Sequence, residues 1–353
     1  MKILCVKADP YVSVVCTEHT SQSDCVDYMS KIQNSAISDG NKLQNSLQNG
    51  DITSSGSVNF VEGIALRKDQ VVTITATFLS KADVDSLDKK RKKELQYCNG
   101  IGNKWFFNQV RDSVRKASNA LKKIKNNDKN NGYYSKNKEV GQDSEHSGVV
   151  SSENIVVGKF ILPLKDYLFR HDQGSFWMAS YRIPQIIGRF MGPLLDSTNM
   201  FRLATALPWA FPKNTIVLQD FILPNSNVKD FFTSMEDQLD VWPVWLLPMR
   251  NIPSEGSLFA SPKGLGDQHL CNVGAYGIPR KKYDFIQANK KLEELLYEFN
   301  GRKVYYSHAF YARDFFYEIL YDGLKYFQLR NRYCHDEALP QIFDKIITHN
   351  GKL

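Results

Sequence analysis

The sequence lacks the short motifs by which a chain holds a nucleotide or a catalytic metal ion without help from another domain. It has no G-x-G-x-x-G after a strand-like run, no Walker loop, no H-E-x-x-H pair and no G-x-S-x-G turn. The G-I-G at 100–102 and the G-L-G at 264–266 are isolated and typical of turns. The seven histidines never stand at a metal-like spacing. These absences predict no metal site and no pocket for a dinucleotide pyrophosphate.

Cysteine spacing and the length of apolar runs exclude two further classes of protein. The six cysteines form no C-x-x-C pair, so neither a zinc site nor the disulfide framework of a small secreted domain is expected. We expect reduced thiols in a compartment that faces the cytosol. No stretch reaches the ~18 apolar residues that a bilayer span needs, so the sequence predicts no membrane anchor within this chain.

The positive charge is modest and lies in polar segments. The chain has 45 Lys and Arg residues against 38 Asp and Glu, a net charge of +7. Its lysine-rich stretches at 88–96 and 122–131 have no interleaved aromatic residues, and no zinc-finger or RNA-binding-sheet signature is present. Nucleic-acid binding is therefore not expected. With 353 residues, 42% of them hydrophobic, the chain is long enough for a sizeable core and for two or more units.

Two low-complexity segments divide the chain. Residues 38–57 and 126–154 are rich in Ser, Asn, Gln, Gly and Lys, with too few apolar residues to pack. We expect the first to form a solvated loop and the second a linker, both leaving the fold as exposed insertions. The linker separates an amino-terminal part, 1–125, from a larger part, 155–353.

The remaining segments predict an α+β fold. Strand-like patterns mark seven regions, the second of them a hairpin: 11–18, 58–80, 155–164, 215–224, 241–250, 269–277 and 303–308. Helical periodicity marks seven others: 23–37, 105–124, 227–239 (with Asn225, Ser226 or Asn227 as N-cap), 283–299, 312–320, 324–333 and 338–347. Strands and helices mix without regular βαβ spacing, which favours an antiparallel sheet flanked by helices that pack on one of its faces. In that sheet 241–250 pairs with 269–277, and Pro243 predicts an edge strand or a bulge.

Seven aromatic or proline-bounded strings carry a family resemblance. In chain order they are FVEGIAL (60–66), KWFFNQV (104–110), PLKDYLFRHDQGSFW (163–177), VLQDFILP (217–224), VWPVWLLP (241–248), VGAYGIPR (273–280) and FFYEILYDGLKYFQLRNRY (315–333). This order resembles the part of delta-24-sterol reductases that follows their flavin-binding domain. The resemblance covers nearly the whole chain outside the two low-complexity segments.

The resemblance implies a cap domain of the vanillyl-alcohol-oxidase type, which covers the flavin ring and shapes the substrate pocket. It implies reduction of the side-chain double bond of a sterol, with FAD as cofactor, NADPH as electron donor and the endoplasmic reticulum membrane as location; a cytoplasmic location is the alternative. Because the chain resembles the cap alone, we expect it not to bind FAD by itself, and its partner is a flavin-binding domain in cis (missing) or in trans. The alternative function is a non-catalytic sterol-binding or interaction module, left after loss of the flavin domain.

One stretch, 165–177, holds the candidate catalytic residues. Relative to the family pattern, Tyr167, Arg170, His171 and Trp177 are retained, while Phe169 and Gln173 replace an expected His and Arg. Alkene reduction needs a hydride at one carbon and a proton at its neighbour. His171 or Tyr167 is the candidate proton donor, and Arg170 is the candidate partner of the flavin. In the alternative reading the stretch is an ordinary strand edge, where His171 bonds to backbone and Arg170 pairs with a surface carboxylate.

Other positions are assigned roles by the resemblance or by their pattern. The predicted cofactor contacts besides Arg170 are Lys104, Trp105 and Tyr276, the last flanked by Gly274 and Gly277. The predicted pocket residues are Trp177, Trp245, Tyr306 and His308. By period two, Tyr306 and His308 share one face of a strand and form a candidate proton relay. Core packing of the tryptophans and a plain turn at the glycines are the alternatives.

Overall fold

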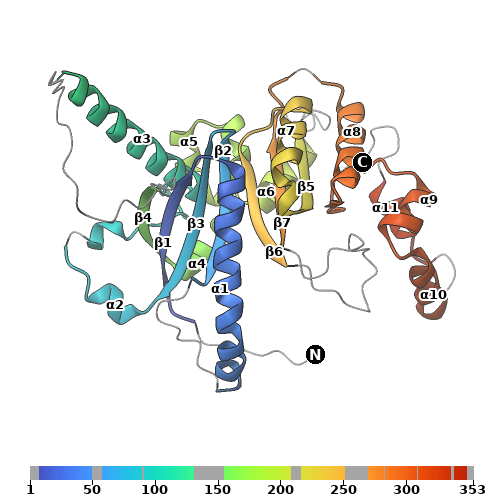
Figure 1. Ribbon diagram of the computed structural model, residues 1–353, viewed down its shortest axis with the longest axis horizontal. Coiled ribbons are helices and arrows are strands. Elements are labelled where there is room, and N and C mark those ends of the chain that lie inside the picture. The colour runs from blue at the N-terminus through green and yellow to red at the C-terminus, as the bar shows by residue number, and fades with distance from the viewer. Residues whose placement is uncertain are drawn as a thin grey trace, which may run out of the picture.

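The computed structural model has one antiparallel sheet at its centre (Figure 1). It describes residues 8–49, 58–89, 91–130, 155–207, 216–250, 269–281, 283–307, 309–334 and 338–347. The sheet has eight strands in the order β4-β1-β3-β2-β6-β7-β5-β8. Their bounds are β1 Tyr11–His19, β2 Phe60–Arg67, β3 Gln70–Leu79, β4 Ile155–Pro163, β5 Val217–Pro224, β6 Val244–Arg250, β7 His269–Gly277 and β8 Arg302–Lys303. The predicted α+β class with an antiparallel sheet is confirmed.

Strands from both sides of the low-complexity segment 126–154 belong to this one sheet. The predicted hairpin is present as β2 and β3, with Lys68 and Asp69 at its turn. β1 lies between β3 and β4, and β2 pairs with β6 through Ile64 and Trp245. The predicted pairing of β6 with β7 is confirmed. The sheet therefore brings residues of β2 next to residues about 180 positions later in the chain.

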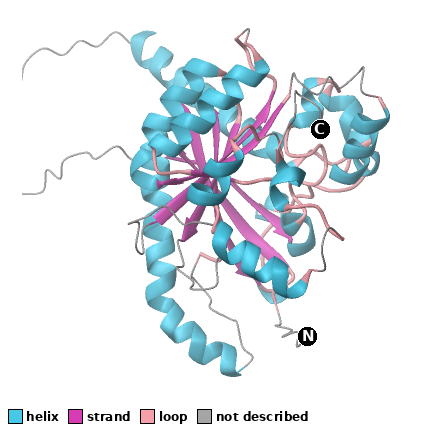
Figure 2. Ribbon diagram, turned by 90° about the vertical axis from the view of Figure 1, so that its right-hand side faces the viewer, coloured by secondary structure: helices cyan, strands magenta, loops and turns pink. Residues whose placement is uncertain are grey.

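The expectation that helices pack on one face only is wrong. Helices cover both faces of the sheet, because each strand directs apolar side chains to both sides. One face packs against α1 (Gln22–Asn49), α7 (Val228–Gln238) and α8 (Phe285–Glu298). The other face packs against α3 (Phe106–Asn130) and the segment that contains α4 (Leu164–Leu168), α5 (Gln185–Phe190) and α6 (Ser197–Ala206). In Figure 1 α1 and α7 lie in front of the sheet and α4 to α6 behind it, and Figure 2 shows the strands fanning between helices.

The shorter elements lie outside the two main layers. They are α2 (Lys81–Asp85), η1 (Arg91–Glu94), η2 (Met178–Tyr181), η3 (Gly192–Leu194), η5 (Asn225–Asn227), α9 (Arg313–Phe315), the π-helix η6 (Phe316–Leu320), α10 (Gly323–Tyr333) and α11 (Ile342–Ile346). The last four surround a separate aromatic cluster centred on Phe316, Tyr317 and Phe343. The predicted helices of 312–347 thus pack mainly on one another.

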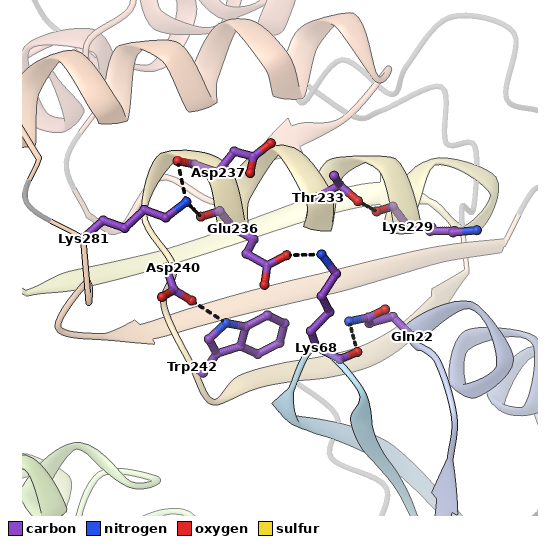
Figure 3. A network of polar contacts seen from close by, with 9 residues as sticks. All are labelled: Gln22, Lys68, Lys229, Thr233, Glu236, Asp237, Asp240, Trp242 and Lys281. Atoms are coloured by element: carbon purple, nitrogen blue, oxygen red, sulfur yellow. Dashed lines mark hydrogen bonds and ion pairs between the residues drawn. The ribbon is translucent and has the colours of Figure 1, made fainter.

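A polar network joins the β2–β3 hairpin to the sheet's helical cover (Figure 3). Lys68 at the hairpin turn forms an ion pair of 2.6 Å with Glu236 of α7. Lys281, which follows β7, donates to backbone carbonyls at the carboxy-terminal end of α7, where a cation also suits the helix dipole. Trp242 donates from its indole to Asp240 at 2.9 Å. These contacts tie α7 to the hairpin turn and to the segment after β7, and they fix the Trp242 ring within the loop before β6.

Several predicted boundaries are wrong. α1 continues to Asn49 through a segment expected to be a loop from residue 38, since a polar composition does not prevent a helix. α3 likewise continues to Asn130, five residues into the expected linker. The rest of both segments, 50–57 and 131–154, lies outside the described residues.

Proline and asparagine signals were also misread. Pro243 precedes β6 instead of interrupting it, and β6 is an inner strand between β2 and β7. Asn227 occupies the N-cap position of α7 but makes no capping bond: its Oδ1 accepts from the Ser226 hydroxyl at 3.1 Å, and its Nδ2 donates to the carbonyl of Phe299. β8 contains only two residues, so the expected strand at 303–308 is mostly turn.

Within the described parts of the chain, no helix is at once long enough and apolar enough to cross a bilayer.

Candidate functional site

A buried carboxylate on β2 organises the candidate site. Glu62 is fully buried and points to the sheet face that α3 and α4 cover. Its Oε1 accepts a hydrogen bond from Arg170 Nε at 2.8 Å. Its Oε2 lies 2.9 Å from His171 Nε2 and accepts from Trp245 Nε1 at 2.8 Å. We call Glu62, Arg170, His171 and Trp245 the Glu62 cluster.

The turn after α4 delivers two of these residues to Glu62. Three successive residues, Gly174, Ser175 and Phe176, have φ values of 77°, 45° and 61°. This left-handed run reverses the chain, and Phe176 N donates to the carbonyl of His171 at 2.8 Å. The Phe176 ring then stacks on the imidazole of His171 with centroids 4.2 Å apart. Left-handed backbone is costly for Ser and Phe, so the surrounding contacts must hold this turn in place.

Electrostatics keep Glu62 ionised. Burial alone would raise the pKa of Glu62, but the charges and hydrogen bonds of His171 and Arg170 outweigh it and hold the pKa well below its usual range. Because an ionised carboxylate only accepts, His171 Nε2 must carry the proton of their shared bond. The other ring nitrogen, Nδ1 of His171, is buried and has no hydrogen-bond partner among the described residues. Nδ1 is therefore the atom of the cluster that can bind a further proton without losing a described hydrogen bond.

Arg170 and Tyr167 form the inner wall of the cluster. The guanidinium of Arg170 lies 4.1 Å from the centre of the Tyr167 ring, and its Nη1 donates to the Tyr167 carbonyl at 2.8 Å. Tyr167 is fully buried, and its hydroxyl has no partner among the described residues. Burial, with the negative charge of Glu62, raises the pKa of Tyr167 far above its usual value, so the phenol keeps its proton.

A second carboxylate lies on β5, and we call it and its partners the Asp220 cluster. Asp220 Oδ1 accepts from Asn272 Nδ2 at 2.8 Å and from the Tyr276 hydroxyl at 2.7 Å. Its Oδ2 accepts from the Tyr306 hydroxyl at 2.7 Å. Burial and the charge of Asp220 raise the pKa of both tyrosines above their usual range. A Cβ at Gly274 would lie 2.6 Å from the Tyr276 oxygen, so glycine makes this arrangement possible.

Phe176 connects the two clusters on one face of the sheet. Its ring centre lies 5.2 Å from that of Trp245 and 5.1 Å from that of Tyr276. Trp177 adds a direct bond, since its indole donates to the Tyr276 carbonyl at 2.7 Å. Glu62, Trp245, Tyr276 and Asp220 thus come from four strands that stand side by side as β2-β6-β7-β5.

An apolar cavity of about 170 Å³ borders this face. Its walls include Ser175, Met178, Tyr181, Met200, Leu218 and Ile278. Ser175 precedes Phe176, and Leu218 stands opposite Tyr276 in the β5–β7 register. A hydrocarbon group in the cavity would therefore lie beside the aromatic residues that join the two clusters.

The structure brings together most of the residues singled out in the sequence. Tyr167, Arg170, His171, Trp177, Trp245 and Tyr276 share one neighbourhood, and Tyr306 joins it through Asp220. The strand-edge reading of Arg170 and His171 is wrong, because both lie in a turn and the carboxylate of Arg170 is buried. Tyr306 lies in a turn and not on a strand, and His308 falls outside the described residues.

Lys104 and Trp105 lie apart from both clusters. Lys104 Nζ pairs with Asp112 at 2.5 Å, a contact within its own segment. Trp105 is buried in a small separate core with Ala179, Leu195 and Met200. Neither residue contacts the Glu62 or the Asp220 cluster through any described hydrogen bond or ring contact.

Sequence reasoning missed Glu62, Asp220 and Asn272. A signal was present, since FVEGIAL and VLQDFILP each place one acid within an otherwise apolar strand. Carboxylates are rarely buried without partners, so an acid on the inner face of a strand indicates a polar site. Its partners could not be read from the sequence, because Arg170 is 108 residues from Glu62.

The chain matches no family model, but it is similar to sterol reductases. A protein named Delta(24)-sterol reductase from Homo sapiens is 24% identical over 300 residues, covering 82% of this chain and 48% of the relative. The Delta(24)-sterol reductase of Rattus norvegicus is 27% identical over 194 residues, with 52% and 37% covered. A Delta(24)-sterol reductase homolog of Caenorhabditis elegans is 22% identical over 302 residues, with 83% and 48% covered. The chain spans about half the length of the curated relatives it matches, which support the resemblance drawn from the sequence strings.

Proposed function

We propose that this chain is the substrate-facing part of a flavin-dependent sterol reductase, which adds a hydride and a proton across the side-chain double bond of a sterol. The observation that carries the proposal is the Glu62 cluster, which holds a histidine whose Nδ1 has no described partner, on the sheet face that an apolar cavity also borders. The similarity to Delta(24)-sterol reductases supports the substrate class. The proposal places the chain at the endoplasmic reticulum membrane.

FAD is the proposed cofactor and NADPH its proposed source of electrons. The described residues fit the flavin ring in part, since the buried Nδ1 of His171 and the hydroxyl of Tyr167 lack partners and aromatic side chains surround them. The sequence has no glycine-rich loop for the pyrophosphate, so the flavin-binding domain must come in cis or in trans. When bound, reduced flavin provides the hydride for one alkene carbon.

His171 delivers the proton in this proposal. Its Nε2 proton is tied to Glu62, which fixes the plane of the ring and stabilises a positive charge on it. The proton that leaves is on Nδ1, and it passes to the alkene carbon next to the one that takes the hydride. The product is the saturated side chain and neutral His171. Tyr167, also with an open hydroxyl, is the second candidate donor.

Arg170 acts through Glu62 in this mechanism. Its Nε and Nη1 are bound to Glu62 and to the Tyr167 carbonyl, so most of the guanidinium is engaged within the chain. Its charge balances the carboxylate when His171 is neutral. Phe176 and Trp245 exclude water from the imidazole by stacking against it and closing its edge. The cation therefore positions the proton donor through Glu62, and His171 takes up a proton from solvent before the next turnover.

The test joins the chain to the flavin-binding domain of a relative and measures sterol reduction with NADPH. Replacing His171 with Phe should slow alkene reduction by ~100-fold or more, the scale for losing a general acid. The melting temperature should fall, because Phe removes a donor from the buried Glu62 carboxylate, so turnover is compared at temperatures where the variant is fully folded. The reduction of the flavin by NADPH should change little. His269→Phe is the matched control, because His269 bonds to Gln33 at the far end of β7.

Two outcomes would overturn the proposal. Full turnover by the His171→Phe variant would show that the cluster only supports the fold. Sterol binding without turnover in the wild-type fusion would favour the non-catalytic sterol-binding module instead. Mass spectrometry must also show that the side-chain double bond of the sterol has been reduced. A sterol that is only bound keeps its mass.

A further inference from the structure

A second cleft, lined by arginines, opens beyond Trp177 on the same side of the sheet. Its volume is about 640 Å³. Four guanidinium groups line it, from Arg67 at the end of β2, Arg111 and Arg115 on one face of α3, and Arg280 after β7. No Asp or Glu residue is among the described residues that line it. We call it the arginine cleft.

Three of the four cations form no ion pair within the described chain, although the charge of Arg111 helps to lower the pKa of the nearby Asp112 carboxyl. Arg115 lies 3.4 Å from Asp112, a carboxylate that is already paired with Lys104. Arg67, Arg111 and Arg280 form no ion pair with any described carboxylate. Lys68 offers a contrast one residue from Arg67, because its ammonium is paired with Glu236 (Figure 3). Converging like charges repel one another, so an anion in the cleft would relieve the repulsion.

The remaining walls suit a phosphate ester better than a simple ion. Ser118, Asn119 and Ser180 line the cleft with neutral hydrogen-bonding groups. Phe107, Trp177 and Trp242 form an aromatic floor, and Arg111 already lies 5.5 Å from the ring centre of Phe107. The planar fork of arginine matches phosphate oxygens in pairs, and an aromatic floor accepts the carbon part of the ester.

We propose that the arginine cleft is a binding site for phosphate esters that carry two or more negative charges. The site goes beyond sterol reduction, since none of the four arginines belongs to the Glu62 cluster. It is nevertheless near that cluster, because Trp177 lines the cleft and touches Phe176 and Tyr276. Soluble nucleotides and the phosphate headgroups of lipids both offer this chemistry.

The test measures binding of two probes to the purified full chain at low salt. The first probe is ADP, followed by calorimetry and by tryptophan fluorescence. The second is phosphatidylcholine vesicles with and without phosphatidic acid, followed by co-sedimentation. Binding of ADP alone assigns a soluble ester, and binding of the acidic vesicles alone assigns a lipid headgroup. Either affinity should fall as salt rises, because the contacts are ionic.

Two variants connect binding to the cleft. Arg111→Gln and Arg280→Gln should each lower the affinity for the probe by roughly 10-fold, the scale for one charge-assisted contact. Lys68→Gln is the matched control and should leave the affinity within about 2-fold, since its charge is already neutralised. The Arg variants should fold normally, because both side chains are exposed. Absence of binding by both probes, or equal binding by the Arg variants and the wild type, would overturn the proposal.

Discussion

Glu62 and Asp220 lie on the same face of one sheet, but their negative charges are balanced in different ways. Glu62 is fully buried and is bound by a guanidinium, an imidazole and an indole. Asp220 is 9% exposed and is bound by two phenols and an amide, all neutral. A carboxylate with no exposed surface needs a nearby cation, whereas one that keeps a small exposed fraction, like Asp220, can be held by neutral donors.

This difference in charge balance determines which of the two clusters can release a proton. In the Glu62 cluster the cations lower the pKa of the acid, and the imidazole has a nitrogen that remains open. In the Asp220 cluster burial, together with the charge of Asp220, raises the pKa of Tyr276 and Tyr306, so these phenols hold their protons. The first arrangement leaves an imidazole nitrogen without a described partner, as the proposed proton transfer requires, and the second forms a fixed hydrogen-bonding surface.

The largest expected effect is a difference in stability between a variant of Glu62 and a variant of Asp220. Glu62→Gln leaves Arg170 buried beside a neutral amide and should lower the free energy of unfolding by about 3–5 kcal/mol. Asp220→Asn removes no ion pair and should cost only about 1 kcal/mol. Urea denaturation of both variants measures the difference. Equal losses of unfolding free energy in the two variants would mean that the cations beside Glu62 add no stability beyond that of neutral hydrogen-bond donors.

A smaller effect is expected from the glycine beneath the Asp220 cluster. Gly274→Ala would place a methyl group 2.6 Å from the Tyr276 oxygen and 2.8 Å from Asp220 Oδ1, and should cost about 1–3 kcal/mol. In a Tyr276→Phe background that oxygen is absent, so the same substitution should cost less. A double-mutant cycle by thermal unfolding gives the coupling. Additive losses would contradict the assigned role of Gly274.

The smallest effects appear at opposite ends of the pH scale. The folded pKa of Glu62 lies below its ordinary value of 4.5, so its stabilisation is complete above that pH and is lost as the pH falls below it. The folded pKa of Tyr306 lies above its ordinary value of 10, so its stabilisation is complete below pH 10 and is lost as the pH rises through the folded pKa.

Melting temperatures from pH 3 to 11 test this pair of signs. The gap between the wild type and Glu62→Gln should narrow only in acid. The gap between the wild type and Tyr306→Phe should narrow only in alkali. A gap of constant size across the whole range, for either variant, would show that the cluster does not titrate with folding.

Local pattern was sufficient for much of the fold. The β2–β3 hairpin follows from two β-branched runs around R-K-D-Q, and the β6–β7 pairing follows from two apolar strands in succession. Both depend on neighbours in the chain, and so they could be read from the sequence. Helix ends could not, since α1 and α3 extend into polar segments whose composition alone suggested loops.

By itself the sequence determined which side chains stand on each strand. It also determined that Tyr167, Arg170 and His171 lie close together in one short segment. Only the tertiary structure decided which carboxylate they meet, because β2 and the turn after α4 are joined through the sheet and not through the chain. The same holds for Asp220, whose partners come from β7 and from the turn that contains Tyr306, 52 to 86 residues away. The physical reason is that burial and the neighbouring charges together set the charge state of an acid, and both are properties of the packed sheet and its covering segments.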